Sequence, residues 1–106
     1  MTMFDNRKKS AETQFALDSA TEFKAQARRN KQLGLWAAEQ MGLKPEERES
    51  YATSVVVADM EEPGDDDVFR FVRKDFHERG VNVTDEALRA KMDELLFEAR
   101  KGLSEG

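Results

Sequence analysis

The stretch TDEALRAKMDELLFEARKGL, residues 84–103, decides the fold class of this chain. Its apolar residues follow one another at steps of 4, 3, 1, 3 and 4 residues, the spacing of one face of a helix. Thr84 stands just before this pattern and is a suitable N-cap, because its hydroxyl can accept a backbone N–H bond. The stretch therefore predicts an amphipathic helix, and its apolar face comprises Leu88, Met92, Leu95, Leu96, Ala99 and Leu103.

Prolines and glycines divide the preceding sequence into three more helical segments. Gly42 suits a left-handed helix end, Pro45 suits a first helical turn, and Pro63 followed by Gly64 is a turn signal. The four predicted helices cover residues 21–42, 45–61, 65–79 and 84–103.

The β-branched residues Val55, Val56 and Val57 also raise the possibility of a strand. No turn signal separates them from the acidic helix start at residues 46–49, and the apolar residues of this segment share one helical face, so a helix is favoured. The expected core residues are Trp36, Val56, Phe69, Val72, Met92, Leu95 and Leu96.

Residues 1–20 differ from the rest because they contain few apolar side chains. Fixing the backbone costs about 1–2 kcal/mol per residue, and so little apolar surface cannot easily offset that cost. We expect an all-α protein with a single four-helix domain over residues 21–106 and an N-terminal arm over residues 1–20, mobile before about residue 18.

The length and composition of the chain fit one small domain and exclude several kinds of functional site. The chain has 106 residues, a net charge of −5 and no cysteine, which excludes disulfides, thiolate metal sites and cysteine nucleophiles. The longest apolar run, residues 55–58, is far too short to span a bilayer, and no stretch resembles a signal peptide, so a cytoplasmic protein that is not membrane-inserted is expected. Residues 1–31 carry a charge of +3 and the remainder −8, a pattern compatible with a basic interaction arm.

The sequence gives little support for catalysis or for a cofactor. Three contiguous acids at residues 65–67 cannot all face one Ca²⁺ ion, and they are better interpreted as N-terminal helix residues that accept backbone N–H bonds. His77 is the single histidine and is expected on the surface near a helix end. Phosphate-loop and nucleophile-elbow motifs are absent, so neither an enzyme nor a metal or cofactor site is predicted.

Arg28, Arg29 and Lys31 form the remaining basic cluster. The acidic net charge argues against nucleic acid as a partner, and the cluster is expected to form a solvated helix face or to pair with the acidic turns. A phosphate-holding role in a small nucleotide- or metabolite-binding regulatory domain stays open as an alternative.

Several segments together resemble a known family, the zeta-type inhibitors of the alphaproteobacterial F-type ATP synthase. The segments are ARRNK (27–31), LGLWAAE (33–39), Gly42 with Leu43, EEPGD (61–65), RAKMDEL (89–95), and Phe4 and Asp5 with Arg7. The resemblance extends over essentially the whole chain.

The resemblance implies a four-helix protein whose mobile N-terminal segment enters the catalytic head of the synthase and blocks ATP hydrolysis. It also implies a protein that is monomeric when free and peripheral to the inner membrane when bound. By position, the partner-binding residues are Phe4, Asp5, Arg7, Lys8, Lys9, Glu12, Phe15, Phe23, Arg28 and Arg29.

Two arm positions depart from the family pattern: Ala11 replaces a usual aromatic residue, and Lys8 a usual acid. Loss of one buried aromatic side chain removes about 1.5–3 kcal/mol of binding free energy. A family member that has lost strong inhibition is therefore a second alternative.

Overall fold

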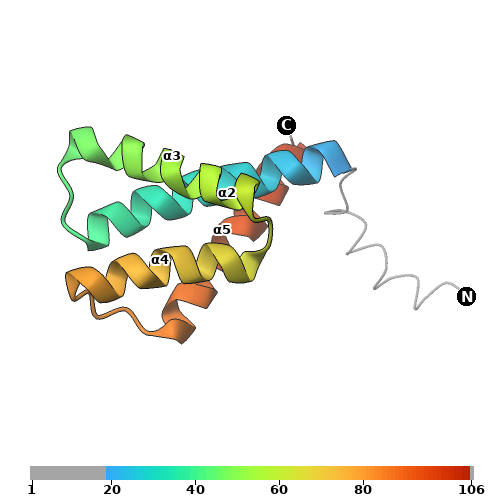
Figure 1. Ribbon diagram of the computed structural model, residues 1–106. Coiled ribbons are helices and arrows are strands. Elements are labelled where there is room, and N and C mark those ends of the chain that lie inside the picture. Colours follow the sequence, from blue (N-terminus) through green and yellow to red (C-terminus); the bar gives the residue numbers. More distant parts are fainter. Residues whose placement is uncertain (1–18, 106) are drawn as a thin grey trace, which may run out of the picture.

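The computed structural model describes residues 19–105, and within this range the chain forms four α-helices and no strand (Figure 1). This confirms the all-α fold class, whereas the expected mobility of residues 1–18 concerns a part of the chain outside the described range. The segment with three consecutive valines is helical, so helical periodicity prevails over β-branching there. The helices are α2 (Ser19–Gln40), α3 (Pro45–Glu61), α4 (Asp65–Arg79) and α5 (Asp85–Glu105).

The ends of these helices follow the local signals in the sequence. Both α3 and α4 have the predicted bounds, and α2 and α5 differ from prediction by one or two residues at each end. Gly42 has a positive φ of 73°, and the N–H of Leu43 donates to the carbonyl of Ala38 at 3.0 Å, as in a glycine-terminated helix. The hydroxyl of Thr84 accepts the N–H of Ala87 at 3.0 Å, which confirms the predicted N-cap.

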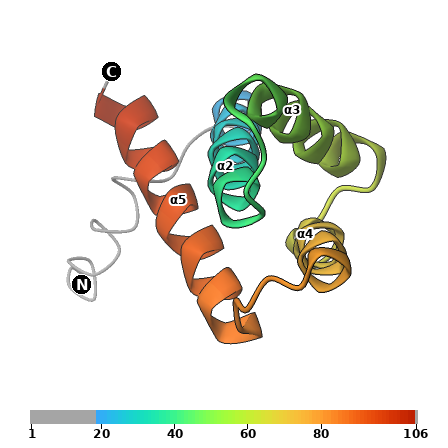
Figure 2. The same ribbon diagram turned by 90° about the vertical axis from the view of Figure 1, so that its left-hand side faces the viewer.

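The central element is α2, which contacts the other three helices. Figure 2 shows α5 on one side of α2 and α3 on the other, with α4 beside α3. The buried core lies between these helices and is formed mainly by Leu33, Ala37, Val55, Val68, Val72, Phe76, Leu88 and Met92.

The backbones of α2 and α3 approach closely at Gly34. A Cβ atom at this position would lie 2.5 Å from the Cα of Ala52, a separation that real Cβ atoms do not tolerate. Gly34 is therefore required for the close crossing of α2 and α3.

The core differs in part from the one predicted. Val72 and Met92 are buried as expected, whereas Trp36, Phe69 and Leu95 are half-buried at its margin. The predictions for Val56 and Leu96 were wrong, because both are only half-buried. On α3, the fully buried valine is Val55, which together with Ala52 faces the core.

Small side chains account for part of this difference. Close helix crossings bury small residues completely and leave large ones at the edge, and the alanines that are buried in this way are Ala25, Ala37, Ala38, Ala52 and Ala99. The indole of Trp36 packs edge-to-face on Phe76 with ring centroids 5.8 Å apart, and the ammonium of Lys91 lies 5.6 Å from the indole centroid.

Candidate partner-binding site

The residues that sequence analysis assigned to partner binding fall into two groups. One group lies outside the described range and comprises Phe4, Asp5, Arg7, Lys8, Lys9, Glu12 and Phe15. The other group, Phe23, Arg28 and Arg29, lies in the first half of α2, next to the point where the arm joins the body.

Phe23 is on the surface. Its side chain is 58% exposed, in the second turn of α2 and only four residues after Ser19. Other large apolar residues that are exposed in the described part of the chain are Val57, Met60 and Phe97. An exposed phenylalanine beside the arm is available to a partner without any rearrangement of the core.

Arg28 is also exposed, but its guanidinium lies against the last turns of α5. A methyl group added at Gly102 would lie 3.0 Å from Nη1 of Arg28. Of the two expectations for the basic cluster, a solvated helix face applies to Arg28, whose guanidinium lies close to the C-terminal end of α5.

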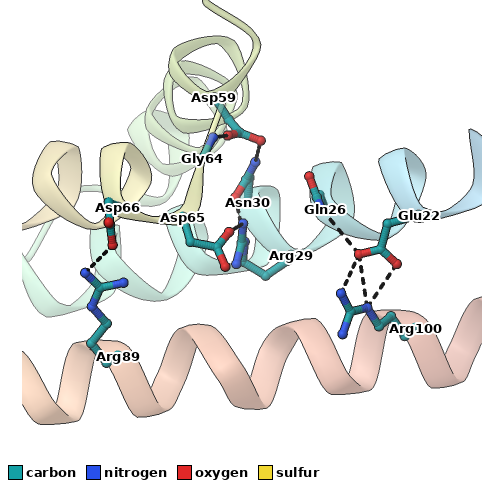
Figure 3. A network of polar contacts seen from close by, with 10 residues as sticks. All are labelled: Glu22, Gln26, Arg29, Asn30, Asp59, Gly64, Asp65, Asp66, Arg89 and Arg100. Carbon is teal, nitrogen blue, oxygen red and sulfur yellow. Dashed lines mark hydrogen bonds and ion pairs between the residues drawn. The ribbon is translucent and has the colours of Figure 1, made fainter. Parts of the chain in front are cut away.

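Arg29, by contrast, is only 1% exposed. Its Nη2 donates to Oδ1 of Asp65 at 2.8 Å, and its Nε donates to Oδ1 of Asn30 at 2.7 Å. Asn30 in turn donates to Asp59 at 2.8 Å, and the second oxygen of Asp59 accepts the N–H of Gly64 at 3.2 Å (Figure 3).

This network fastens the middle of α2 to the turn between α3 and α4. It confirms the expectation that the basic cluster pairs with an acidic turn, and it places Arg29 inside the fold. Lys31 is engaged as well, since its ammonium lies 3.4 Å from the carboxylate of Glu49. Because two of the three basic side chains are paired internally, the structure gives no support to the phosphate-binding alternative.

The three consecutive acids that begin α4 do not cap it through their side chains. The N-cap residue is Gly64, without a side-chain cap, and the prediction that these carboxylates accept backbone N–H bonds is corrected. Each carboxylate instead pairs with an arginine. Asp65 pairs with Arg29 of α2, Asp66 with Arg89 of α5, and Asp67 with Arg70 one turn further along α4.

The pair between Asp66 and Arg89 links α4 to α5. Nη2 of Arg89 donates to Oδ1 of Asp66 at 2.7 Å, and the guanidinium lies 4.1 Å from the ring centroid of Phe69. The hydrogen bond from Arg89 lowers the pKa of Asp66. Acids at the start of α4 still complement the helix dipole, as expected, but two of their three pairs are interhelical, and the third, Asp67–Arg70, lies within α4.

A second interhelical pair joins Glu22, in the first turn of α2, to Arg100, near the end of α5. Nε of Arg100 donates to both carboxylate oxygens, at 3.0 and 3.1 Å, and Nη2 donates to Oε2 at 2.5 Å (Figure 3). Gln26, one turn further along α2, also donates to this carboxylate at 3.3 Å. The hydrogen bonds from Arg100 are the largest cause of a lowered pKa for Glu22.

This pair was not predicted from the sequence. Glu22 and Arg100 are 78 residues apart, and no local pattern relates them. The sequence contains only a weak signal for this pair, namely an acid at the start of one long helix and a base near the end of another.

His77 is exposed near the end of α4, as predicted. Among residues 19–105, no set of three or more histidine, aspartate or glutamate side chains is placed to hold a metal ion. Over the same range, no helix combines the length and the apolar character that crossing a membrane requires.

These features define a small all-helical protein in which carboxylates and arginines of different helices tie the bundle together. The model of the family "ATPase inhibitor subunit zeta" matches residues 1–102, and the chain therefore belongs to this family. The match includes the arm and all four described helices, apart from the last residues of α5. A comparison with curated proteins finds no match. The family assignment indicates a regulatory protein and confirms the resemblance to zeta-type ATPase inhibitors.

Proposed function

We propose that this protein inhibits ATP hydrolysis by the F-type ATP synthase and that residues 1–20 are the inhibitory arm. The arm binds as a helix at an interface between subunits of the catalytic head, and the four-helix body carries it. The observation on which this proposal rests is the family match, which begins at residue 1 and so includes the whole arm.

The geometry at the start of α2 supports this division. The last two residues of the arm, 19 and 20, already belong to α2, and Phe23 is exposed within the next turn. A helix that forms in the arm on binding can therefore continue the axis of α2. Phe23 and Arg28 then extend the contact surface, whereas Arg29 acts from inside the fold by fixing α2 on the body.

The energetics require a broad interface. Ordering about 15 arm residues costs roughly 15–30 kcal/mol of backbone entropy, and burying Phe4 and Phe15 returns only about 1.5–3 kcal/mol each. The bound arm must therefore also gain helix hydrogen bonds and further contacts over at least about 1,000 Å². The polar arm residues Asp5, Arg7, Lys8, Lys9 and Glu12 are the candidates for these contacts.

The proposal is tested by measuring ATP hydrolysis by the cognate synthase head while this protein is added. We expect turnover to fall in a saturable manner. The substitution Phe23→Ser provides a matched variant, because Phe23 is exposed and its loss leaves the core intact. It should weaken inhibition without a change in the thermal midpoint. Unchanged turnover at micromolar excess of the wild-type protein would show that this family member has lost inhibition.

A further inference from the structure

The first turns of α2 are joined to the last turns of α5 by hydrogen bonds between Glu22 and Arg100. The turn between α3 and α4 reaches α2 at Arg29 and Asn30, through Asp65 and Asp59. Ahead of these residues, Arg100 in the last turns of α5 donates to Glu22, and the guanidinium of Arg28 lies near Gly102, where an added Cβ atom would be 3.0 Å from its Nη1.

One face of α2 carries these contacts. Glu22, Ala25 and Arg28 follow at intervals of three residues, and Ala25 between them is fully buried. In Figure 3, Glu22 and Arg100 meet between the two helices, well apart from the network around Arg29. The start of α2 is therefore attached to α5 separately from the network around Arg29. We term this attachment the Glu22–Arg100 clamp.

We propose that Arg100 is a positioning residue for inhibition: through Glu22 it keeps the first turns of α2 helical and so fixes where, and in which direction, the arm leaves the body. This inference rests on the proposed function of the arm. It makes inhibition depend on residues at the opposite end of the chain from the arm.

The physical reason is the cost of starting a helix. The first N–H groups of a helix lack intrahelical partners, so helix ends fray unless side chains or packing hold them. Nucleation is unfavourable, with a constant of about 0.001, whereas extending an existing helix is nearly free. A clamped first turn of α2 therefore serves as a nucleus from which the arm can extend as a helix when it binds.

The geometry of the clamp suits this role. A bidentate arginine–carboxylate pair fixes orientation as well as distance, unlike a single point contact. The side chains are 25% exposed for Glu22 and 37% for Arg100, so the pair is partly shielded from solvent. The position of Glu22 in the first helical turn also complements the helix dipole.

The substitution Arg100→Gln tests the inference, with Arg89→Gln as the matched control. Both remove one interhelical arginine–carboxylate pair from α5, but Asp66, the partner of Arg89, lies in α4 away from the arm. We expect Arg100→Gln to speed amide exchange at residues 19–28 by about tenfold and to weaken inhibition by about threefold to tenfold. Arg89→Gln should change neither quantity. Unchanged exchange at residues 19–28 in Arg100→Gln would overturn the inference, and so would faster exchange with unchanged inhibition.

A double-mutant cycle separates positioning through Glu22 from a direct role of Arg100. If Arg100 acts through Glu22, then Glu22→Gln and the double variant should weaken inhibition as much as Arg100→Gln alone. Additive losses would mean that Arg100 contacts the enzyme itself, which would contradict the inference. A chain without residues 1–18 gives the separate test of the arm: if it still inhibits, the proposed function fails, while the exchange at residues 19–28 still reports on the clamp.

Discussion

Small side chains decide how closely the helices of this protein approach one another. Gly34 faces the backbone of Ala52 across the seam between α2 and α3, and Ala25 and Ala99 are buried in the two helices that meet at the clamp. Larger aromatic residues such as Trp36 then pack around these crossings instead of within them. The close approach brings polar side chains within reach of neighbouring helices, and Arg29 is buried as a result.

The substitution Gly34→Ala should lower the free energy of unfolding by about 1–3 kcal/mol. The added methyl group would lie 2.5 Å from the Cα of Ala52, and backbone atoms cannot move aside as a flexible side chain can. The matched control is Gly102→Ala, where the nearest atom is the end of the Arg28 side chain at 3.0 Å. We expect this control to leave stability unchanged or to raise it by up to about 1 kcal/mol, because alanine is the better helix former. Urea unfolding of both variants measures the difference, and equal midpoints would show that α2 and α3 can separate at no cost.

Position 11 is a second test at the scale of one residue, and it concerns the arm outside the described range. If this position meets an apolar pocket of the enzyme, Ala11→Phe should strengthen inhibition by about tenfold or more. Inhibition constants for the wild type and the variant, measured at one salt concentration, decide the question. Equal constants would mean that position 11 faces solvent in the complex.

The helices themselves were predictable because their signals are local. Glycine at a left-handed end, proline in a first turn, threonine at an N-cap and a 3.6-residue apolar repeat each lie within a few residues of the boundary that they set. The clamp and the network around Arg29 were not predictable in the same way. Their partners are 78 and 36 residues apart, and pairing depends on which faces of the helices meet. The same reason explains why Val55, and not Val56, is fully buried: the two differ by 100° around one helix, and only tertiary packing chooses between them.

The clamp between α2 and α5 should give stability a specific dependence on pH. The hydrogen bonds from Arg100 lower the pKa of Glu22 below its ordinary value of 4.5. Because the pKa of Glu22 is lower in the folded state, its carboxylate contributes fully to the free energy of unfolding at any pH above its pKa in the unfolded chain. This contribution is lost as the pH falls through the pKa of the folded state. The wild type should therefore be more stable than Glu22→Gln by a constant amount above about pH 5, and the difference should shrink below about pH 4.5. Denaturant unfolding of both proteins between pH 7 and pH 3 checks this, and a difference that does not vary with pH would show that Glu22 is not paired in solution.

At the scale of the whole molecule, positive charge is concentrated in the first 31 residues and negative charge in the remainder. Residues 1–31 carry +3 and the remainder −8, which sequence analysis interpreted as a basic arm on an acidic body. Within the described residues, part of this asymmetry is neutralised internally, since Arg29 pairs with Asp65 and Lys31 with Glu49. The other described bases of this segment, Lys24 and Arg28, are exposed, and its three remaining bases, Arg7, Lys8 and Lys9, lie in the arm outside the described range.

The central claim, that the arm inhibits and the body carries it, is tested most directly by deleting residues 1–18 and measuring ATP hydrolysis by the cognate enzyme. The core and every interhelical pair described above lie after this segment, so the thermal midpoint should stay nearly unchanged. We predict that inhibition disappears in this folded, truncated protein while the full chain still inhibits. A truncated protein that inhibits as strongly as the full chain would contradict the account.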